Sequence, residues 1–164
     1  MKQFSTTFVL FSLILSLSGC GNSVTGNTPV SLKAALKDNF FIGTALNLHH
    51  IHGEDEAGLE IVKNHFSSIV AENCMKSMYM QPEEGMFFFD DADKFVAFGE
   101  QNKMHITGHT LIWHSQAPSW FFTDENGNDV SADQLKERMK THIQTIVMRY
   151  KGRIHGWDVV NEAI

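Results

Sequence analysis

The chain has 164 residues, of which 43% are hydrophobic and 20% are charged, and its formal net charge is -6. These values fit a soluble globular domain and exclude a disordered or fibrous chain. The acidic balance argues against nucleic acid as a partner, because domains that bind nucleic acid carry a basic patch.

The first twenty residues form a segment of their own. Lys2 is the only positive charge before an apolar stretch over residues 8–17. That stretch is shorter than the ~20 residues that a membrane-spanning helix needs, and it has the length of a signal-peptide core. It ends in the letters LSGC at 17–20, which resemble a bacterial lipoprotein signal. The resemblance implies that Cys20 carries lipid; a plain signal peptide with a chance cysteine is the alternative.

The lipoprotein interpretation predicts how the chain is divided and where it resides. We expect residues 1–20 to be the signal, 21–30 to be a flexible tether of small and polar residues, and 31–164 to be the folded part. The protein would be exported and held by lipid at a membrane or cell surface. Cys74 would then have no disulfide partner within the chain, and we expect it to be a buried apolar side chain.

From about Ser31 the sequence alternates short apolar runs with amphipathic segments. The apolar runs at 40–48, 67–71, 106–113 and 154–160 predict four strands. The segments 58–66 and 91–104 predict helices between the first three of them. The clearest helix begins at Ser131, where Gln134 has the spacing of a capping box. It continues through Tyr150 and stops at Gly152.

Repeated strand–helix units with apolar strands predict a parallel sheet covered by helices. No glycine-rich phosphate loop follows the first predicted strand, which argues against a nucleotide-binding sheet. Each predicted strand is followed by groups able to do chemistry, at 49–50, 72–73, 109–114 and 161–162. A (β/α)8 barrel carries its reactive residues at the C-terminal ends of its strands. We therefore predict an α/β fold, a (β/α)8 TIM barrel, of which about the first four β/α units are present.

Three groups of residues suit work on a sugar. Glycoside cleavage needs a carboxylic acid with a raised pKa, which a partly apolar surrounding supplies. Glu162 follows the apolar end of a predicted strand, and the amide of Asn161 beside it can hydrogen-bond a sugar 2-hydroxyl. The aromatic and polar side chains at 109–116 suit sugar rings and hydroxyls. The carboxylate, amide and amine at 72–76 could hold several hydroxyls at once.

Taken together, four stretches resemble glycoside hydrolase family 10, the endo-β-1,4-xylanases. They read AENCMK at 71–76, QPEEG at 81–85, GHTLIWHSQAPSW at 108–120 and WDVVNEA at 157–163. They occur in the family's order and span about residues 31–164, and the third is long and specific.

The resemblance implies a (β/α)8 barrel that hydrolyses β-1,4-xylan or xylo-oligosaccharides with retention of configuration. It needs no cofactor or metal and no obligate protein partner. Glu162 would be the acid/base, with Asn161 on the 2-hydroxyl. The residues expected to line the subsites on the non-reducing side are Glu72, Asn73, Lys76, His109 and Trp113. His114 and Gln116 would be supporting polar groups.

The chain departs from the family's pattern in two ways. Ser77 stands where the family often has tryptophan, which changes packing near Lys76 and removes no catalytic group. No residue corresponds to the family's nucleophile, a glutamate near the end of the seventh strand. We therefore expect residues 31–164 to be the N-terminal half of a catalytic domain, inactive on its own.

Three other functions remain open. The residues 49–52, HHIH, could hold zinc as in some amidohydrolase barrels, although GEDE at 53–56 makes this segment look like a polar surface loop. A non-catalytic glycan-binding lipoprotein would use the same tryptophan and histidine surface without hydrolysis. A related β-glycanase of the same barrel superfamily, acting on β-glucan or mannan, would share the Asn-Glu pair.

Overall fold

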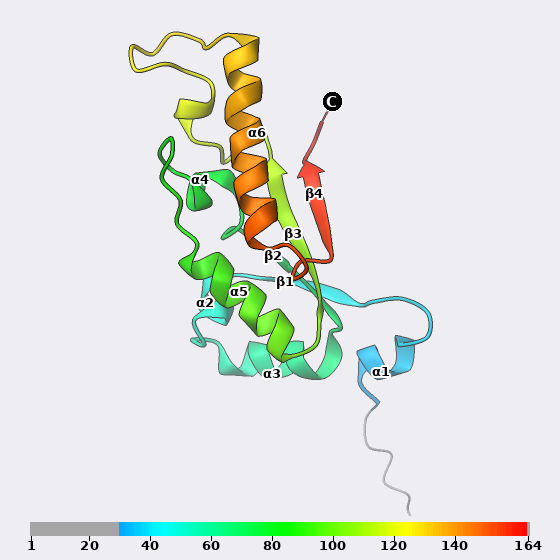
Figure 1. The fold of residues 1–164 in the computed structure, drawn as a ribbon. Helices are drawn as coiled ribbons and strands as arrows, with labels where there is room; N and C mark the ends of the chain where they lie inside the picture. The colour runs from blue at the N-terminus through cyan, green and yellow to red at the C-terminus, as the bar shows by residue number, and fades with distance from the viewer. Residues whose placement is uncertain (1–29, 164) are drawn as a thin grey trace, which may run out of the picture.

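The computed structural model describes residues 30–163, and Figure 1 shows their arrangement. The predicted signal, nearly all of the tether and the lipidation site Cys20 lie outside the described residues. Four strands form one sheet in the order β1-β2-β3-β4, and every neighbouring pair is parallel. The strands are β1 (Gly43–Leu46), β2 (Ser68–Ala71), β3 (His105–Ile112) and β4 (Gly156–Val160). The parallel sheet predicted from the apolar runs is confirmed.

Helical segments connect each strand to the next. The connections contain α2 (Leu48–Ile51) and α3 (Glu56–His65), then α4 (Ser77–Met80) and α5 (Asp90–Gln101), then the 3₁₀ turn η1 (Ser119–Phe121) and α6 (Ala132–Arg149). A short helix, α1 (Leu32–Leu36), precedes the first strand. Strand–helix–strand connections between parallel neighbours are the building units of a (β/α) barrel, so this half of the predicted fold is confirmed.

Helix α6 forms where its local signals predict it. The Ser131 hydroxyl accepts a hydrogen bond from the Gln134 N–H at 3.2 Å, which is the half of the predicted capping box found in the structure. Gly152, just past the helix, has φ +77°, a conformation that glycine adopts without steric cost. The Tyr150 hydroxyl donates to Asp93 Oδ1 at 2.9 Å. This bond joins the end of α6 to α5.

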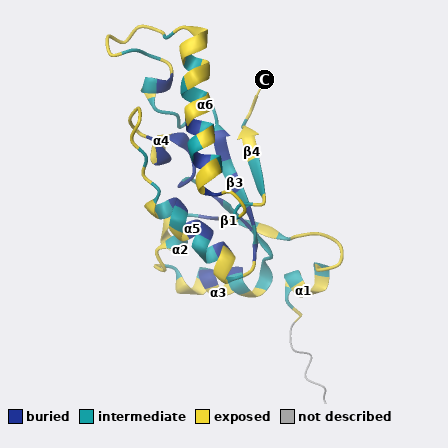
Figure 2. Ribbon diagram, viewed as in Figure 1, coloured by how far each residue is buried: buried dark blue, intermediate teal, exposed yellow. Residues whose placement is uncertain are grey.

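The hydrophobic core lies between the sheet and the helices α5 and α6 (Figure 2). Phe95 of α5, Ile106 of β3 and Ile146 of α6 are completely buried there. Close packing requires glycine at Gly108 of β3, because a Cβ atom there would stand 2.2 Å from the ring of Trp157 in β4. Cys74 is buried, as expected, and has no disulfide partner among residues 30–163; burial raises the pKa of its thiol to about 12.

Some predicted boundaries differ from the structure. The first strand begins at Gly43 rather than at residue 40, and the side chains of Phe40 and Phe41 are 60% and 64% exposed. The apolar run therefore predicted that this strand exists but not the residue at which it begins. Helix α5 ends at Gln101 rather than at 104, because Lys103 takes a left-handed φ of +54°. Within residues 30–163, no helix is both long and apolar enough to cross a membrane.

Candidate active site

The C-terminal ends of the strands bring the predicted site residues to one end of the sheet. The backbone hydrogen bonds continue past the strand ends: Glu72 N–H donates to Leu46 O, and Asn161 N–H donates to Ile112 O, both at 2.9 Å. The first bond holds the residue after β2 beside the end of β1, and the second holds the residue after β4 beside the end of β3. Residues that are 40 to 90 positions apart in the sequence therefore share one surface, as a barrel requires.

Lys76 is the centre of a polar cluster after β2. Its side chain is buried, and its ammonium donates to Asn73 Oδ1 at 3.0 Å and to Gln116 Oε1 at 2.5 Å. Gln116 in turn donates through Nε2 to Asn73 Oδ1 at 3.3 Å. The ammonium also lies 4.9 Å from the centre of the Trp113 ring. Amide oxygens and an aromatic face thus compensate the buried charge.

The backbone holds the Gln116 side chain in this cluster. Gln116 has φ +46°, and its carbonyl accepts hydrogen bonds from Met78 N–H at 3.1 Å and from the Ser77 hydroxyl at 3.4 Å. Ser77 is itself buried. The small hydroxyl of Ser77 therefore bonds to the loop after β3.

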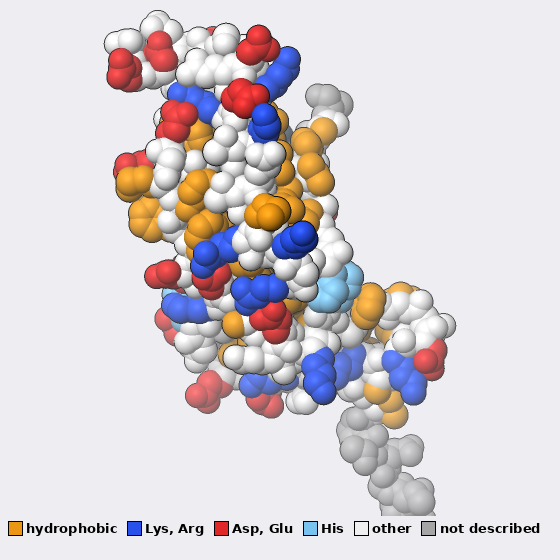
Figure 3. Space-filling model, viewed as in Figure 1, with side chains coloured by type: hydrophobic (Ala, Val, Ile, Leu, Met, Phe, Trp, Pro, Cys, Tyr) orange, Lys and Arg blue, Asp and Glu red, His pale blue; other side chains and the backbone are white. Residues whose placement is uncertain are grey.

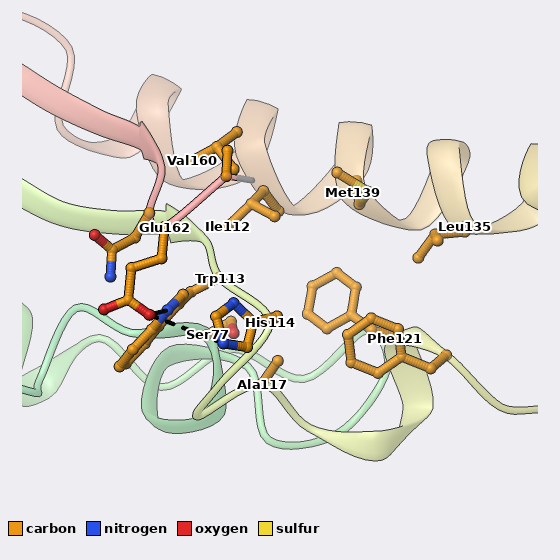
Figure 4. Close-up of a pocket in the computed structure, with 13 residues that line it drawn as sticks. Ser77, Ile112, Trp113, His114, Ala117, Phe121, Leu135, Met139, Val160 and Glu162 are labelled. Atoms are coloured by element: carbon orange, nitrogen blue, oxygen red, sulfur yellow. Dashed lines mark hydrogen bonds and ion pairs between the residues drawn. The ribbon is translucent and has the colours of Figure 1, made fainter.

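Glu162 and Trp113 meet at the ends of β4 and β3 (Figure 4). The indole N–H of Trp113 donates to Glu162 Oε2 at 3.1 Å, and His114 Nε2 lies 3.8 Å from the same oxygen. The side chain of Glu162 is 58% exposed, and its backbone has φ +51°. The carboxyl therefore has one oxygen held by aromatic side chains, while most of its surface faces solvent.

A cavity of ≈ 590 Å³ lies beside this carboxyl group. Its wall includes Asn161 and Glu162 together with the apolar side chains of Ile112, Phe121 and Met139. Figure 4 shows Glu162, Trp113 and His114 at one end of this space and Phe121, Leu135 and Met139 at the other.

His109 is held by a residue that the sequence analysis did not single out. Its Nδ1 lies 2.9 Å from Oδ2 of Asp158, and the two residues are paired in the register of β3 and β4. The hydroxyl of Thr110 donates to the Asp158 carbonyl at 2.9 Å. The peptide bond between His109 and Thr110 is cis. The strand register reveals Asp158 as the partner of His109. The sequence carried one signal for this role, namely the place of Asp158 in the WDVVNEA stretch.

Other predicted residues are less tightly held. Glu72 is exposed, and its carboxylate accepts only a long 3.5 Å hydrogen bond from Asn73 Nδ2 among the described residues. The histidines after β1 lie in or beside α2 and pair with carboxylates: His49 with Glu54 at 2.6 Å, and His52 with Asp91 at 2.7 Å. Residues 30–163 contain no group of three or more His, Cys, Asp or Glu side chains placed to hold a metal ion.

Comparison with protein families matches residues 31–164 to the family described as glycosyl hydrolase family 10. The chain belongs to glycoside hydrolase family 10. It is 46% identical over 159 residues to endo-1,4-beta-xylanase A of Xylanibacter ruminicola, covering 97% of this chain and 42% of that relative. It is 49% identical over 135 residues to endo-1,4-beta-xylanase C of Paenibacillus barcinonensis, covering 81% of this chain and 12% of that relative.

Solved structures of this family share the fold. A psychrophilic glycoside hydrolase family 10 endo-beta-1,4-xylanase superposes with a TM-score of 0.77 at 46% identity, over 82% of this chain and 40% of that chain. A GH10 endoxylanase retrieved from a sugarcane soil metagenome gives a TM-score of 0.78 at 44% identity, with 82% and 39% covered. The family 10 chain described here thus spans less than half the length of these relatives, and its sheet corresponds to part of a (β/α)8 barrel.

Proposed function

We propose that the protein takes part in the retaining hydrolysis of β-1,4-xylosidic bonds in xylan, with Glu162 as the acid/base. The observation that carries this proposal is the placement of Glu162. Its carboxyl group meets the indole N–H of Trp113 at the end of β4, beside the Lys76 cluster. The names of the relatives, which are endo-1,4-beta-xylanases, support xylan as the substrate.

The chemistry assigned to each residue follows from its contacts. Glu162 donates its proton to the glycosidic oxygen as the bond breaks, and then takes a proton from water in the second half of the reaction. The amide of Asn161 hydrogen-bonds the 2-hydroxyl. The ring of Trp113 supplies a face for a sugar ring, and Lys76 and Asn73 offer hydrogen bonds to hydroxyls from a preformed cluster.

The remaining predicted residues have supporting roles in this proposal. His109, oriented by Asp158, and the exposed Glu72 face the same end of the sheet and offer further hydrogen bonds to the substrate. Gln116 fixes Lys76 and Asn73 in place. His114 lies against Glu162 and contributes to its electrostatic surroundings.

Retaining hydrolysis also needs a second carboxylate, ~5–5.5 Å from the first, to attack the anomeric carbon. We assign this role to none of the residues 30–163. We therefore infer that these residues bind xylo-oligosaccharide and supply the acid/base, and that the 164-residue chain by itself does not release reducing sugar from xylan. Release that Glu162→Gln abolishes would contradict this inference.

A chimera tests the acid/base role directly. Residues 31–163 would replace the matching part of the Xylanibacter ruminicola xylanase, and we expect the chimera to hydrolyse xylan. In the chimera, Glu162→Gln should lower kcat/KM on xylan by ~10²–10⁴-fold, because kcat/KM reports the first step, in which the leaving group is protonated. The loss should be much smaller on an aryl β-xylobioside whose phenolate leaves without protonation. Glu60→Gln on α3, away from the site, is the matched control.

The two substrates separate the possible outcomes. Equal losses on xylan and on the aryl glycoside would show that Glu162 is not the acid. A chimera that binds xylo-oligosaccharide and hydrolyses neither substrate would favour the non-catalytic glycan-binding function. A chimera that prefers β-glucan or mannan would favour a related β-glycanase.

Lipid anchoring is a separate proposal that rests on the sequence alone. We propose that Cys20 is lipidated and that the exported protein is held at a membrane. Expression in a bacterium with labelled palmitate should label the wild-type protein and leave Cys20→Ser unlabelled and soluble. Equal labelling and the same membrane association in both would contradict the proposal.

A further inference from the structure

A second hollow lies on the outer side of the Lys76 cluster. It has a volume of ≈ 230 Å³ and lies between α2, α4 and the first turn of α5. We call it the Tyr79 groove, and its walls are formed by Leu48, Asn73, Cys74, Tyr79, Phe88, Asp90 and Asp91. It is smaller than the ~300–1,000 Å³ pockets that hold drug-sized ligands, and it suits a single ring.

Two exposed aromatic side chains form one wall of the groove. Tyr79 is 43% exposed and Phe88 is 56% exposed. The N–H of Phe88 donates to the carbonyl of Met80 at 2.8 Å, so the backbone holds Phe88 beside α4. Figure 3 shows hydrophobic side chains gathered over the segment between α4 and α5. Aromatic faces of this kind pack against the C–H face of a sugar ring.

Two carboxylates also line the groove. Asp90 is exposed, and its side chain has no hydrogen bond or ion pair within residues 30–163. Asp91 Oδ1 is bonded to His52 Nε2 at 2.7 Å and lies 3.7 Å from the Lys94 ammonium, so this carboxylate is paired. Cys74 is a neutral thiol, since burial raises its pKa to about 12. The groove therefore offers hydrogen-bond acceptors and an apolar face, and the unpaired carboxylate of Asp90 gives it a negative charge.

The groove shares one residue, Asn73, with the Lys76 cluster. Asn73 lines the groove, and its Oδ1 also holds the ammonium of Lys76 at 3.0 Å. A sugar bound at the Lys76 cluster thus has the groove as its neighbour. All the groove residues come from the connections that follow β1 and β2, so the groove is formed entirely within the described part of the chain.

We propose that the Tyr79 groove binds one further neutral sugar ring of the oligosaccharide held at the Lys76 cluster, and that it rejects uronic acids. Tyr79 and Phe88 supply the apolar face, and Asp90 and Asp91 accept hydrogen bonds from hydroxyls. The unpaired carboxylate of Asp90 repels a sugar that carries a carboxylate of its own. The inference rests on the proposed function, because the first rings must bind at Lys76.

Titrations with oligosaccharides of increasing length test the groove. Affinities of the full chain for xylobiose, xylotriose and xylotetraose would be measured by calorimetry. We expect one added ring to raise the affinity roughly tenfold. Tyr79→Ala and Phe88→Ala should each remove most of that gain and leave the affinity for the shortest ligand that binds unchanged. Met86→Ala is the matched control, because Met86 is exposed on the same segment and does not line the groove.

The same series separates failure of the groove from failure of the proposed function. If the Tyr79 and Phe88 variants weaken the binding of all oligosaccharide lengths equally, or of none, the proposed role of the groove is wrong and the proposed function is unaffected. Lys76→Met should abolish binding of every length. If no xylo-oligosaccharide binds the wild-type chain, the proposed function fails and so does the groove as an extension of it.

A charge test needs only single sugars at high concentration. Methyl β-xyloside should shift the NMR signals of the Tyr79 ring, and glucuronate should shift them at least several-fold less. Asp90→Asn should narrow that difference. If glucuronate binds at the groove as tightly as methyl β-xyloside does, the proposed selectivity is wrong.

Discussion

Protonation of a buried histidine should make the protein unstable in mild acid. His142 of α6 is completely buried, and its Nδ1 lies 2.7 Å from Oε1 of Gln81. Since the amide oxygen is an acceptor, the neutral ring carries its proton on Nδ1. Nε2 has no hydrogen-bond partner among the described residues. The rings of Phe87 and Phe121 pack against the imidazole, with centroids 6.3 Å and 5.2 Å away.

The pKa of His142 sets the size of the effect. Burial lowers this pKa from 6.5 to about 4. Between those two values the unfolded chain binds a proton that the folded protein does not. The stabilising contribution is therefore complete above pH 6.5 and is lost as the pH falls toward 4. Because one pKa unit corresponds to about 1.4 kcal/mol, the loss at pH 4 is roughly 3 kcal/mol.

Urea denaturation at pH 7 and pH 4 measures this loss. His142→Asn places an amide N–H where Nδ1 stands, so it keeps a donor for Gln81 and removes the titration. We expect the free energy of unfolding to fall by roughly 3 kcal/mol more in the wild type than in this variant. His49→Asn is the control, because that side chain is 74% exposed and its loss should change the pH dependence by less than ~1 kcal/mol.

A parallel pH dependence in wild type and His142→Asn would refute the reasoning. It would mean that the folded protein binds the proton as readily as the unfolded chain does, as it would if water reached Nε2. A direct NMR titration of the His142 ring tests this explanation, which predicts a folded pKa near 6.5.

Two further predictions concern the packing of the core. Gly108→Ala should lower the free energy of unfolding by about 3 kcal/mol, because its Cβ would overlap the ring of Trp157. Gly156→Ala, whose Cβ meets no atom within 4 Å, should cost less than ~1 kcal/mol in the same urea series, and equal losses would contradict the packing argument. The thiol of Cys74 should resist iodoacetamide at pH 8 in the folded protein and react in urea, as followed by peptide mass mapping. If iodoacetamide modifies Cys74 in the folded protein as fast as it does in urea, the thiol is accessible and the prediction is wrong.

Much of the local structure was predictable because its signals lie close together in the sequence. The start of α6 depends on Ser131 and Gln134, three positions apart, and its end depends on Gly152. Four apolar runs separated by helices predicted four parallel strands, because a strand buried on both faces needs an unbroken apolar sequence. The first strand was predicted too long, since Phe40 is apolar and yet exposed.

The segments that form the candidate site could be predicted for a different reason. The stretches around Asn73, Trp113 and Glu162 resemble one family, and the family match covers them all. The sequence also placed these residues after strand ends, and parallel strands bring such ends to one side. The sequence alone therefore predicted which segments meet at this end of the sheet, where we propose the site.

Only the tertiary structure decided which side chains touch. Lys76 and Gln116 are 40 positions apart, and His109 and Asp158 are 49 apart, so their contacts follow from strand register and loop conformation. The Tyr79 groove depends in the same way on α2, α4 and α5 meeting at one rim. Local sequence patterns concern residues within a helical turn or along one strand. These contacts join segments that are far apart in the sequence, so they form only when the whole sheet has assembled.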